Sequence, residues 1–417
     1  MLPNTPIASG IPAGELHLPD QTSNKMSSFH VVMSANQAWN IYNFRLGLVS
    51  SLIAAGVRVT ILAPLDSSSA KLKALGCDII DVPMASQGIN PVVDGLLIAS
   101  YVRLLHRLKP DLSINYTIKP NIYGSIAARL AGVPSLAIVT GLGYTFINDN
   151  IVARMARKLF AVALRYPAQV WFLNADDQRV FLQKNLVDPN KTRVLDGEGV
   201  DTSYFSPTVE ARKDSGFRFL LVARMLWDKG IAEYVEAAQI VKRVYPNARF
   251  QLLGATGVDN PSAASSDQVK AWHDAGIVEY LGTSTDVRGV ISNADCVVLP
   301  SYREGVPRTL MEAAAMAKPL IATDVPGCRE VVRDGKNGFL CKVRDGEDLS
   351  RKMIDMLELP SVQRAALGAA SRTYVKSRFD EKLVIAKYFD FLAGGHAAVK
   401  FIRAAPVDQT GLETSAS

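Results

Sequence analysis

The sequence has few of the residues and patterns that mark disulfide-rich, metal-binding or membrane-spanning proteins. Its 417 residues include only four cysteines, far apart and without a C-x-x-C pair, and five histidines without metal-ligand spacing. This excludes a disulfide framework and a zinc site and predicts reduced, mostly buried thiols. The cysteines are Cys77, Cys296, Cys328 and Cys341. No run of about 20 uncharged apolar residues is present, so we expect no transmembrane helix.

Two nucleotide-binding signatures are also missing. No G-x-G-x-x-G follows the first predicted strand, which disfavours a nicotinamide or flavin dehydrogenase, and no G-x-x-x-x-G-K-[ST] is present, which excludes a P-loop NTPase. The net charge of +6 is too small for a chain-wide nucleic-acid surface. With 48% hydrophobic and 21% charged residues, the chain is that of a globular protein. We expect no cofactor, no metal and no nucleic acid.

Residues 1–27 are rich in Pro, Ser, Asn and Gly and lack both a basic start and an apolar segment. They therefore predict a flexible tail and not a signal peptide. We expect the protein to stay in the cytoplasm, in solution or on a membrane surface.

The rest of the chain predicts two α/β domains of similar size. Apolar strand-like runs alternate with helical patterns over 28–205 and again over 206–377, with a polar segment at their junction. Such alternation is typical of parallel, doubly wound sheets, so we expect two Rossmann-like domains facing a central cleft at the carboxyl ends of their strands. A last helix over 378–393 is expected to pack back on the N-terminal domain, before a polar tail over 394–417.

The most informative segment covers residues 300–313, where an apolar strand is followed by a loop and an Ala-rich helix. Gly305 allows close approach of a ligand, and Pro307 stands near the first helical position, where proline is tolerated. Free N–H groups at that helix start suit a diphosphate. Glu304, just before the helix, and Glu312, about two turns on, can accept hydrogen bonds from sugar hydroxyls at two ends of an elongated ligand.

Two cations follow the first strand of the second domain. Arg224 and Lys229 leave the carboxyl end of that strand together, where cations can neutralise a phosphate pair. Taken alone, both could be solvated loop charges, and Glu312 could be a helix-surface residue. Their joint occurrence in one α/β domain favours a binding site.

These segments resemble the donor-binding domain of the family-4 retaining glycosyltransferases, which have the GT-B fold. The Glu-x7-Glu motif of that family matches Glu304 and Glu312, its Arg/Lys pair matches Arg224 and Lys229, and the resemblance runs through most of 216–345. It implies that Arg224 and Lys229 bind the diphosphate and steady the departing charge, that Glu312 holds the ribose, and that Glu304 and the backbone of 305–308 hold the sugar. The implied catalytic residues are Glu304, Arg224 and Lys229. The implied donor-binding residues are Arg224, Lys229, Glu304, Gly305, Val306, Pro307, Arg308, Thr309, Leu310 and Glu312.

The resemblance implies no metal, and the sequence has no D-x-D motif; Asp176-Asp177 is interpreted as a helix cap. In the first domain, residues 115–124 resemble a family segment that often carries a functional His three residues before Lys, but Tyr116 stands at that place. No base is therefore assigned, and an oxygen of the leaving diphosphate is the alternative. The candidate acceptor or cleft residues are Ser34, Asn36, Asn40, Arg45, Tyr116, Lys119, Asn121 and Gly143. Lys119 and Asn121 could equally form a structural turn.

Residues 99–165 contain nine Lys and Arg against two Asp, a local excess of seven positive charges. Within them, residues 151–166 alternate apolar and basic groups at helical spacing. Such a helix can lie on an anionic membrane or meet a lipid diphosphate. The alternative is an ordinary amphipathic helix packed on its own sheet.

The whole-chain pattern is similar to bacterial enzymes that extend undecaprenyl-diphosphate-linked glycans in capsule, O-antigen and protein-glycan assembly. The resemblance implies a UDP-N-acetylhexosamine donor and a polyprenyl-diphosphate sugar acceptor, on the inner face of the bacterial cytoplasmic membrane. Three alternatives are transfer to another glycan or small molecule, a UDP-N-acetylglucosamine 2-epimerase of the same fold, and a non-catalytic sugar-nucleotide sensor.

Overall fold

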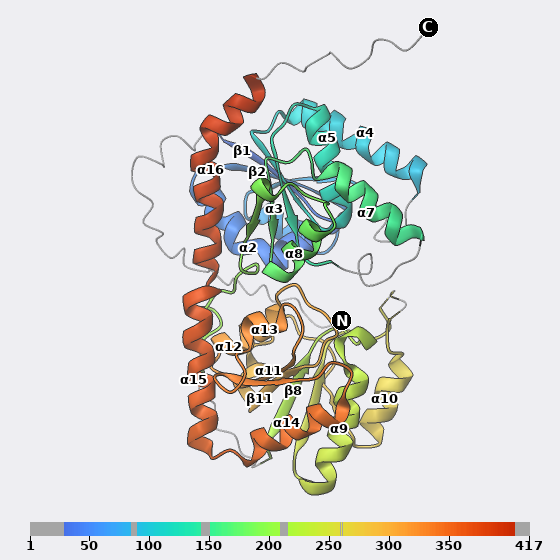
Figure 1. Cartoon of the computed structure of the whole chain (residues 1–417), viewed down its shortest axis with the longest axis vertical. Helices are drawn as coiled ribbons and strands as arrows, with labels where there is room; N and C mark the ends of the chain where they lie inside the picture. Colours follow the sequence, from blue (N-terminus) through green and yellow to red (C-terminus); the bar gives the residue numbers. More distant parts are fainter. Residues whose placement is uncertain are drawn as a thin grey trace, which may run out of the picture.

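The computed structural model describes residues 29–84, 90–142, 151–208, 216–258, 260 and 262–404, with the side chains of 151–153 and 395–404 excepted. The predicted tail over 1–27 and the candidate residue Gly143 lie outside these ranges. Two α/β lobes lie one above the other, and the long helices at the end of the chain run along one side of both (Figure 1).

The N-terminal lobe is built on a parallel seven-stranded sheet in the order β3-β2-β1-β4-β5-β6-β7. The central strands are continuous apolar runs because helices cover both faces of the sheet. The strands are β1 His30–Ser34, β2 Arg58–Ala63, β3 Asp78–Asp81, β4 Leu112–Tyr116, β5 Ser135–Val139, β6 Gln169–Phe172 and β7 Thr192–Val194. The edge strands β3 and β7 are short and carry charged residues, so neither has the apolar run that predicts a buried strand.

Two helical layers enclose this sheet. One core joins a face of the sheet to α4, α5, α7 and α8, and the other joins the opposite face to α2, α3 and α16. The helices are α2 Ala38–Ala54, α3 Ser69–Ala74, α4 Pro91–Leu108, the π-helical turn η1 Pro120–Gly124, α5 Ser125–Leu130, α7 Ile151–Ala163, α8 Ala175–Gln183 and the 3₁₀ turn η2 Pro189–Lys191.

The C-terminal lobe repeats the plan with a parallel six-stranded sheet in the order β10-β9-β8-β11-β12-β13. The strands are β8 Arg218–Val222, β9 Arg249–Leu253, β10 Glu279–Tyr280, β11 Cys296–Leu299, β12 Leu320–Thr323 and β13 Gly338–Cys341. The helical elements are η3 Trp227–Lys229, α9 Ile231–Val244, α10 Ser266–Asp274, α11 Arg288–Asn293, α12 Arg308–Ala315, α13 Cys328–Val331, α14 Gly346–Glu358 and α15 Ser361–Arg378.

After α15, which packs on α12, the chain returns to the N-terminal lobe as α16, Glu381–Ala404. At the crossing, the Val200 N–H donates to the Phe379 carbonyl at 2.9 Å and the Glu381 N–H to the Val200 carbonyl at 3.0 Å. The helix then packs on α2, and Tyr388 meets Trp171 with ring centroids 5.0 Å apart. It continues past residue 393 to Ala404, so the last helix is longer than the predicted range 378–393. None of the described helices has the length and apolar character needed to cross a membrane.

Candidate functional site

The candidate site forms where the loops after β8 and β11 meet. Lys229 ends the 3₁₀ turn η3, and Gly230 follows in a left-handed conformation with φ 72°. A Cβ on Gly230 would lie 2.1 Å from the Pro300 carbonyl oxygen, so only glycine lets the two loops approach this closely. The contact brings Lys229 Nζ to 2.6 Å from Glu304 Oε1. Arg224 lies just beyond β8 with an exposed side chain, accessible to a ligand.

The Glu304 carboxylate is held by two groups of its own lobe. Besides Lys229, the Ser301 hydroxyl donates to Glu304 Oε1 at 2.7 Å. The Glu304 side chain is 14% exposed and the Lys229 side chain is 20% exposed. Both charged groups are therefore mostly buried but still accessible to a ligand. A mostly buried carboxylate with fixed hydrogen-bond partners, such as that of Glu304, is suited to bind hydroxyl groups in a fixed direction.

Helix α12 begins at Arg308, with Pro307 as its extended N-cap residue. The Thr309 hydroxyl donates to the Val222 carbonyl at 3.1 Å, which ties the helix to the end of β8. Leu310 is fully buried in the core, so its side chain cannot reach a ligand. Arg308 Nε donates to Glu312 Oε1 at 2.8 Å. Burial raises the pKa of the Glu312 carboxyl even though the Arg308 charge opposes this.

The backbone at Gly305 lies between the two lobes. A Cβ on Gly305 would lie 2.5 Å from the carbonyl oxygen of Thr140, directly after β5, and a Cβ on Gly327 would lie 2.3 Å from the Gly305 carbonyl oxygen. Val306 is 8% exposed. The carboxyl edge of the N-terminal sheet therefore touches the loop before α12.

In the N-terminal lobe, the structure buries two candidates that we expected in the cleft. Tyr116 is 0% exposed, and its hydroxyl donates to that of Tyr388 at 3.3 Å. Burial raises the pKa of Tyr116 to about 12. The Arg45 guanidinium lies 3.9 Å from the centre of the Tyr116 ring and pairs with Glu198. The expectation that Tyr116 and Arg45 line an open cleft is therefore wrong, because α16 covers them.

Arg45 also belongs to a small enclosed cavity between α2 and α16. The cavity has a volume of about 20 Å³, enough for a single water. Its lining residues are Phe44, Arg45, Leu48, Glu198, Glu381, Val384, Ile385 and Tyr388. Burial raises the pKa of Glu381 in this lining to about 7.

The remaining first-lobe candidates are mostly structural. Lys119 pairs with Asp94 of α4 at 2.9 Å, and both side chains are largely buried. Asn121 is buried, and its amide donates to the Ile138 carbonyl at 2.8 Å. These contacts favour the structural turn of the two alternatives: Asn121 lies in η1, and Lys119 is the residue that precedes it. Ser34 is fully buried.

Asn36 and Asn40 are half-buried at the start of α2. The Asn36 N–H donates to the Thr117 hydroxyl at 3.3 Å, and the Asn40 side-chain oxygen accepts from Arg45 at 2.5 Å. These two asparagines stay candidates for contact with an acceptor.

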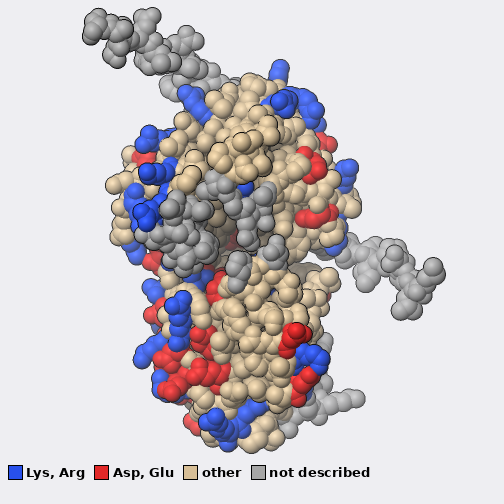
Figure 2. All heavy atoms as spheres, turned by 90° about the vertical axis from the view of Figure 1, so that its right-hand side faces the viewer, with Lys and Arg blue, Asp and Glu red and all other residues tan. Residues whose placement is uncertain are grey.

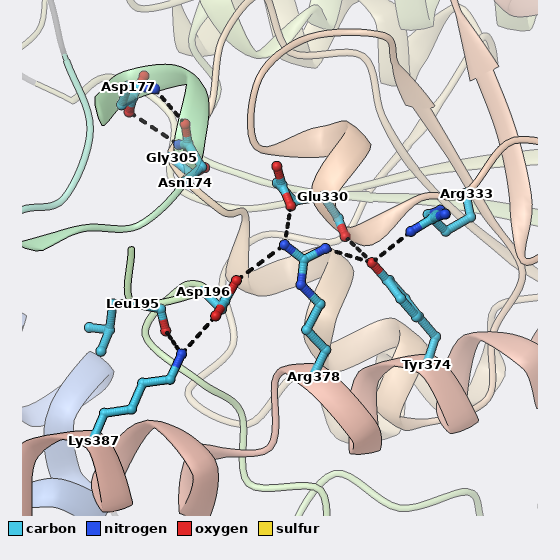
Figure 3. A network of polar contacts seen from close by, with 10 residues as sticks. All are labelled: Asn174, Asp177, Leu195, Asp196, Gly305, Glu330, Arg333, Tyr374, Arg378 and Lys387. Carbon is cyan, nitrogen blue, oxygen red and sulfur yellow. Dashed lines mark hydrogen bonds and ion pairs between the residues drawn. The ribbon is translucent and has the colours of Figure 1, made fainter. Parts of the chain in front are cut away.

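Sequence reasoning missed two polar contacts between the lobes. Asp176-Asp177 was interpreted as a helix cap, but the N-cap of α8 is Asn174 and both aspartates lie in the first turn. Asp177 is fully buried and pairs with Arg303 at 2.5 Å. Asn174 Nδ2 donates to the Gly305 carbonyl at 2.6 Å (Figure 3). The position of Asn174, directly after an expected strand at the carboxyl edge of its sheet, is the signal that could have found it.

A second polar network lies where the chain passes from α15 of the C-terminal lobe to α16 on the N-terminal lobe. Arg378 at the end of α15 bonds to Asp196 at 3.1 Å and to Glu330 of α13 at 2.5 Å, and Lys387 of α16 pairs with Asp196 at 2.7 Å (Figure 3). Burial alone would raise the pKa of Asp196, but the bonds and charges of Lys387 and Arg378 outweigh it and lower that pKa. The linker after β7 is thereby joined to α13 and α16.

Each of the two lobes matches a known protein family. The family "Glycosyl transferases group 1" matches residues 206–374, and "Glycosyl transferase 4-like" matches residues 30–172. Together the two matches cover most of the described chain.

Relatives of established function are similar over most of their length. An N,N'-diacetylbacillosaminyl-diphospho-undecaprenol alpha-1,3-N-acetylgalactosaminyltransferase of Campylobacter jejuni is 29% identical over 365 residues, 84% of this chain and 94% of the relative. The UDP-Gal:alpha-D-GlcNAc-diphosphoundecaprenol alpha-1,3-galactosyltransferase of Escherichia coli is 26% identical, over 63% of this chain and 70% of the relative.

Solved structures share the fold. A sucrose-phosphate synthase from Thermosynechococcus elongatus superposes with a TM-score of 0.74 at 18% identity, covering 89% of this chain and 100% of that one. Anabaena HepE in complex with UDP and glucose gives a TM-score of 0.72 at 19% identity, covering 88% and 100%. The predicted fold class is confirmed: the two lobes match two glycosyltransferase families, group 1 over residues 206–374 and 4-like over residues 30–172, and the chain has the GT-B fold.

Proposed function

We propose that the protein transfers a sugar, an N-acetylhexosamine, from a UDP-sugar to a polyprenyl-diphosphate-linked sugar, with retention of configuration, in bacterial surface polysaccharide or glycan assembly. Two relatives support the acceptor class, because their names specify undecaprenyl-diphosphate-linked sugars. One of them transfers N-acetylgalactosamine, which supports the sugar class.

The observation that carries the proposal is the 2.6 Å contact of Lys229 with Glu304 at the ends of β8 and β11. Bond cleavage at the anomeric carbon leaves negative charge on the diphosphate and positive charge on the sugar. A cation and a carboxylate side by side can stabilise both, which is the kind of electrostatic term that contributes most to catalysis. Lys229 and the exposed Arg224 then hold the diphosphate, and Glu304 accepts hydrogen bonds from sugar hydroxyls.

The rest of the donor fits along α12. Glu312 lies one turn into α12, and one of its carboxylate oxygens accepts a hydrogen bond from Arg308. Its other oxygen accepts hydrogen bonds from the ribose hydroxyls. The backbone of 305–308 lies at the helix start, where N–H groups favour an anion.

The acceptor proton requires a base, and Tyr116 is not suitable. It is fully buried with a pKa raised to about 12, and its hydroxyl is bonded to Tyr388. We infer that the oxygen of the departing diphosphate takes the proton from the acceptor hydroxyl as the new bond forms. Departure and attack on the same face of the sugar preserve its configuration.

The partner surface is proposed to be an anionic membrane that carries the lipid acceptor. We define the α4–α5 surface by the exposed apolar side chains Val92 (72% exposed), Leu96 (67%) and Leu130 (63%) and the exposed cations Arg103 and Arg107. Apolar groups beside cations suit the headgroup region of an anionic bilayer. In Figure 2 this side of the molecule faces the viewer, and Lys and Arg gather along the left margin and top of the upper lobe.

The neighbouring helix α7 serves two purposes under this proposal. Phe160 and Ala163 are buried in the core of the N-terminal lobe, as in an ordinary amphipathic helix. Its other face leaves Arg154, Met155 and Lys158 exposed, on the same helical layer as α4 and α5. We therefore include this exposed face in the membrane contact.

The proposed reaction is tested by incubating the protein with radiolabelled UDP-N-acetylgalactosamine or UDP-N-acetylglucosamine and bacterial lipid extract, followed by solvent partition. We expect label to move into the organic phase, with a preference for one donor. The transfer should persist in excess chelator and should fall at least a hundredfold in the Lys229→Ala variant. Label that remains in water as an epimerised sugar nucleotide would instead establish the isomerase. Release of free UDP without labelled lipid would refute the lipid acceptor.

A further inference from the structure

The loop formed by residues 303–306, here called the donor loop, contacts the opposite lobe at Arg303 and Gly305. Arg303 pairs with Asp177. The Gly305 carbonyl accepts a hydrogen bond from Asn174 Nδ2 at 2.6 Å, and Figure 3 shows Gly305 beside Asn174 and Asp177. The Gly305 backbone also packs against the Thr140 carbonyl, as described above. The loop that we propose to hold the sugar therefore rests on the carboxyl edge of the N-terminal sheet.

The two side chains on the opposite lobe are rigidly held. Asn174 is 1% exposed, and its Oδ1 accepts the Asp177 N–H at 2.8 Å while its Nδ2 also contacts Asp177 Oδ2 at 3.2 Å. Asp177 is 0% exposed. Because buried polar groups are costly to leave without partners, both side chains keep their direction toward the donor loop.

The charge balance makes the contact specific. Asp177 contributes a fully buried carboxyl, whereas Arg303 is 26% exposed. Withdrawing Arg303 would leave that carboxyl without its cation, and breaking a buried ion pair from one side is strongly unfavourable. Burial raises the pKa of Asp177 although Arg303 and Asn174 oppose this, which agrees with a group that depends on its partners.

We propose that Asn174 and Asp177 are positioning residues, which hold the donor loop from the N-terminal lobe in the conformation that binds the transferred sugar. The inference rests on the function proposed above and distinguishes how the two halves of the donor are bound. The nucleotide half of the donor binds to side chains of the C-terminal lobe, whereas the loop that binds the sugar half is held by both lobes.

The first test is Asn174→Ser, in which the hydroxyl can still cap α8 but does not reach the Gly305 carbonyl. The matched control is Asn90→Ser. Asn90 is likewise the N-cap of its helix, α4, and its side-chain oxygen accepts from the Val92 and Val93 N–H groups of that helix. We measure kcat and KM for the UDP-sugar, calorimetric affinity for UDP alone, and the unfolding midpoint.

We expect Asn174→Ser to lower kcat at least tenfold, with the Kd for UDP within twofold of wild type, because small displacements of a reacting group are costly. Asn90→Ser should keep both values. A parallel fall of kcat and UDP affinity with the unfolding midpoint would overturn the proposal in favour of a merely structural role. An unchanged kcat in folded protein would overturn it as well.

A second variant keeps the test decisive if Asn174→Ser does not fold. Arg303→Met removes the other contact from the partly exposed side, and Arg303→Lys retains the charge. We expect a tenfold or greater loss of kcat in the first, partial recovery in the second, and normal UDP affinity in both; equal kcat in all three proteins would refute the proposal. Lys229→Ala distinguishes failure of the proposed function from failure of this inference. If Lys229→Ala retains activity, the proposed function of the site is wrong. If Lys229→Ala is inactive but the Asn174 and Arg303 variants retain activity, only the positioning role is wrong.

Discussion

Replacing Lys229 by alanine tests the proposed chemistry most directly. The change removes the cation that lies 2.6 Å from Glu304 and leaves this carboxylate with the Ser301 hydroxyl. Loss of one preorganised group that stabilises developing charge typically costs 10²–10³ in kcat, about 3–4 kcal/mol. We therefore expect kcat for sugar transfer to fall by about that factor, with a smaller loss in Lys229→Arg.

The same change should affect folding far less. The pair is partly exposed, 20% and 14%, so its contribution to the free energy of unfolding is about 1 kcal/mol. That corresponds to a shift of the unfolding midpoint of about 2–4 °C for a domain of this size.

The control is Lys270→Ala, which breaks an exposed pair with Asp274 on α10 in the same lobe, with side chains 70% and 55% exposed. It should leave both activity and the midpoint close to wild type. Initial rates with the labelled donor and a thermal unfolding curve measure the two quantities. If Lys229→Ala keeps more than half of wild-type kcat while still binding UDP, the assignment of the leaving-group cation is wrong.

Three further predictions follow from the packing. Gly305→Ala should abolish transfer, because a Cβ there would lie 2.5 Å from the Thr140 carbonyl oxygen. Gly289→Ala in α11, where the Cβ would have open space, should preserve both activity and stability. Equal activities of the two variants would contradict this prediction. Burial raises the pKa of Glu381 from 4.5 to about 7, so the folded state keeps a proton that the unfolded chain releases. The stability from this group is complete below pH 4.5 and lost as the pH rises through 7; Glu381→Gln should therefore raise the unfolding midpoint above pH 7 but not below pH 4.5, and an equal effect at both would refute it. Leu96→Ser with Leu130→Ser should reduce co-flotation with anionic vesicles without lowering the midpoint, since both side chains are over 60% exposed; unchanged flotation would count against the membrane surface.

Local sequence predicted the elements that carry the candidate site. Strands β8 and β11 are apolar runs, and the cation-bearing and acidic loops follow them directly, so the carboxyl edge of one sheet brought Lys229 and Glu304 together as expected. Such proximity follows from topology alone, because neighbouring parallel strands end at the same edge.

Contacts between the lobes could not be predicted in the same way. Asn174 and Gly305 are 131 residues apart, and no periodicity in either segment indicates that they meet. Tyr116 ends a strand, where a ligand would be expected, but the sequence does not show that Tyr388 of the last helix covers it. The short edge strands β3 and β7 carry charged residues and lack the apolar run that identifies a buried strand.

The return of α16 to the first lobe sets an order on the folding of the nascent chain. Tyr388 and Leu392 complete the same core as Leu48 and Trp171, yet they leave the ribosome only after the entire second lobe. At an elongation rate of about 20 residues per second this delay is on the order of 10 s. During that interval the part of this sheet face that α16 covers lacks its helix, so the N-terminal lobe is completed last although it is synthesised first.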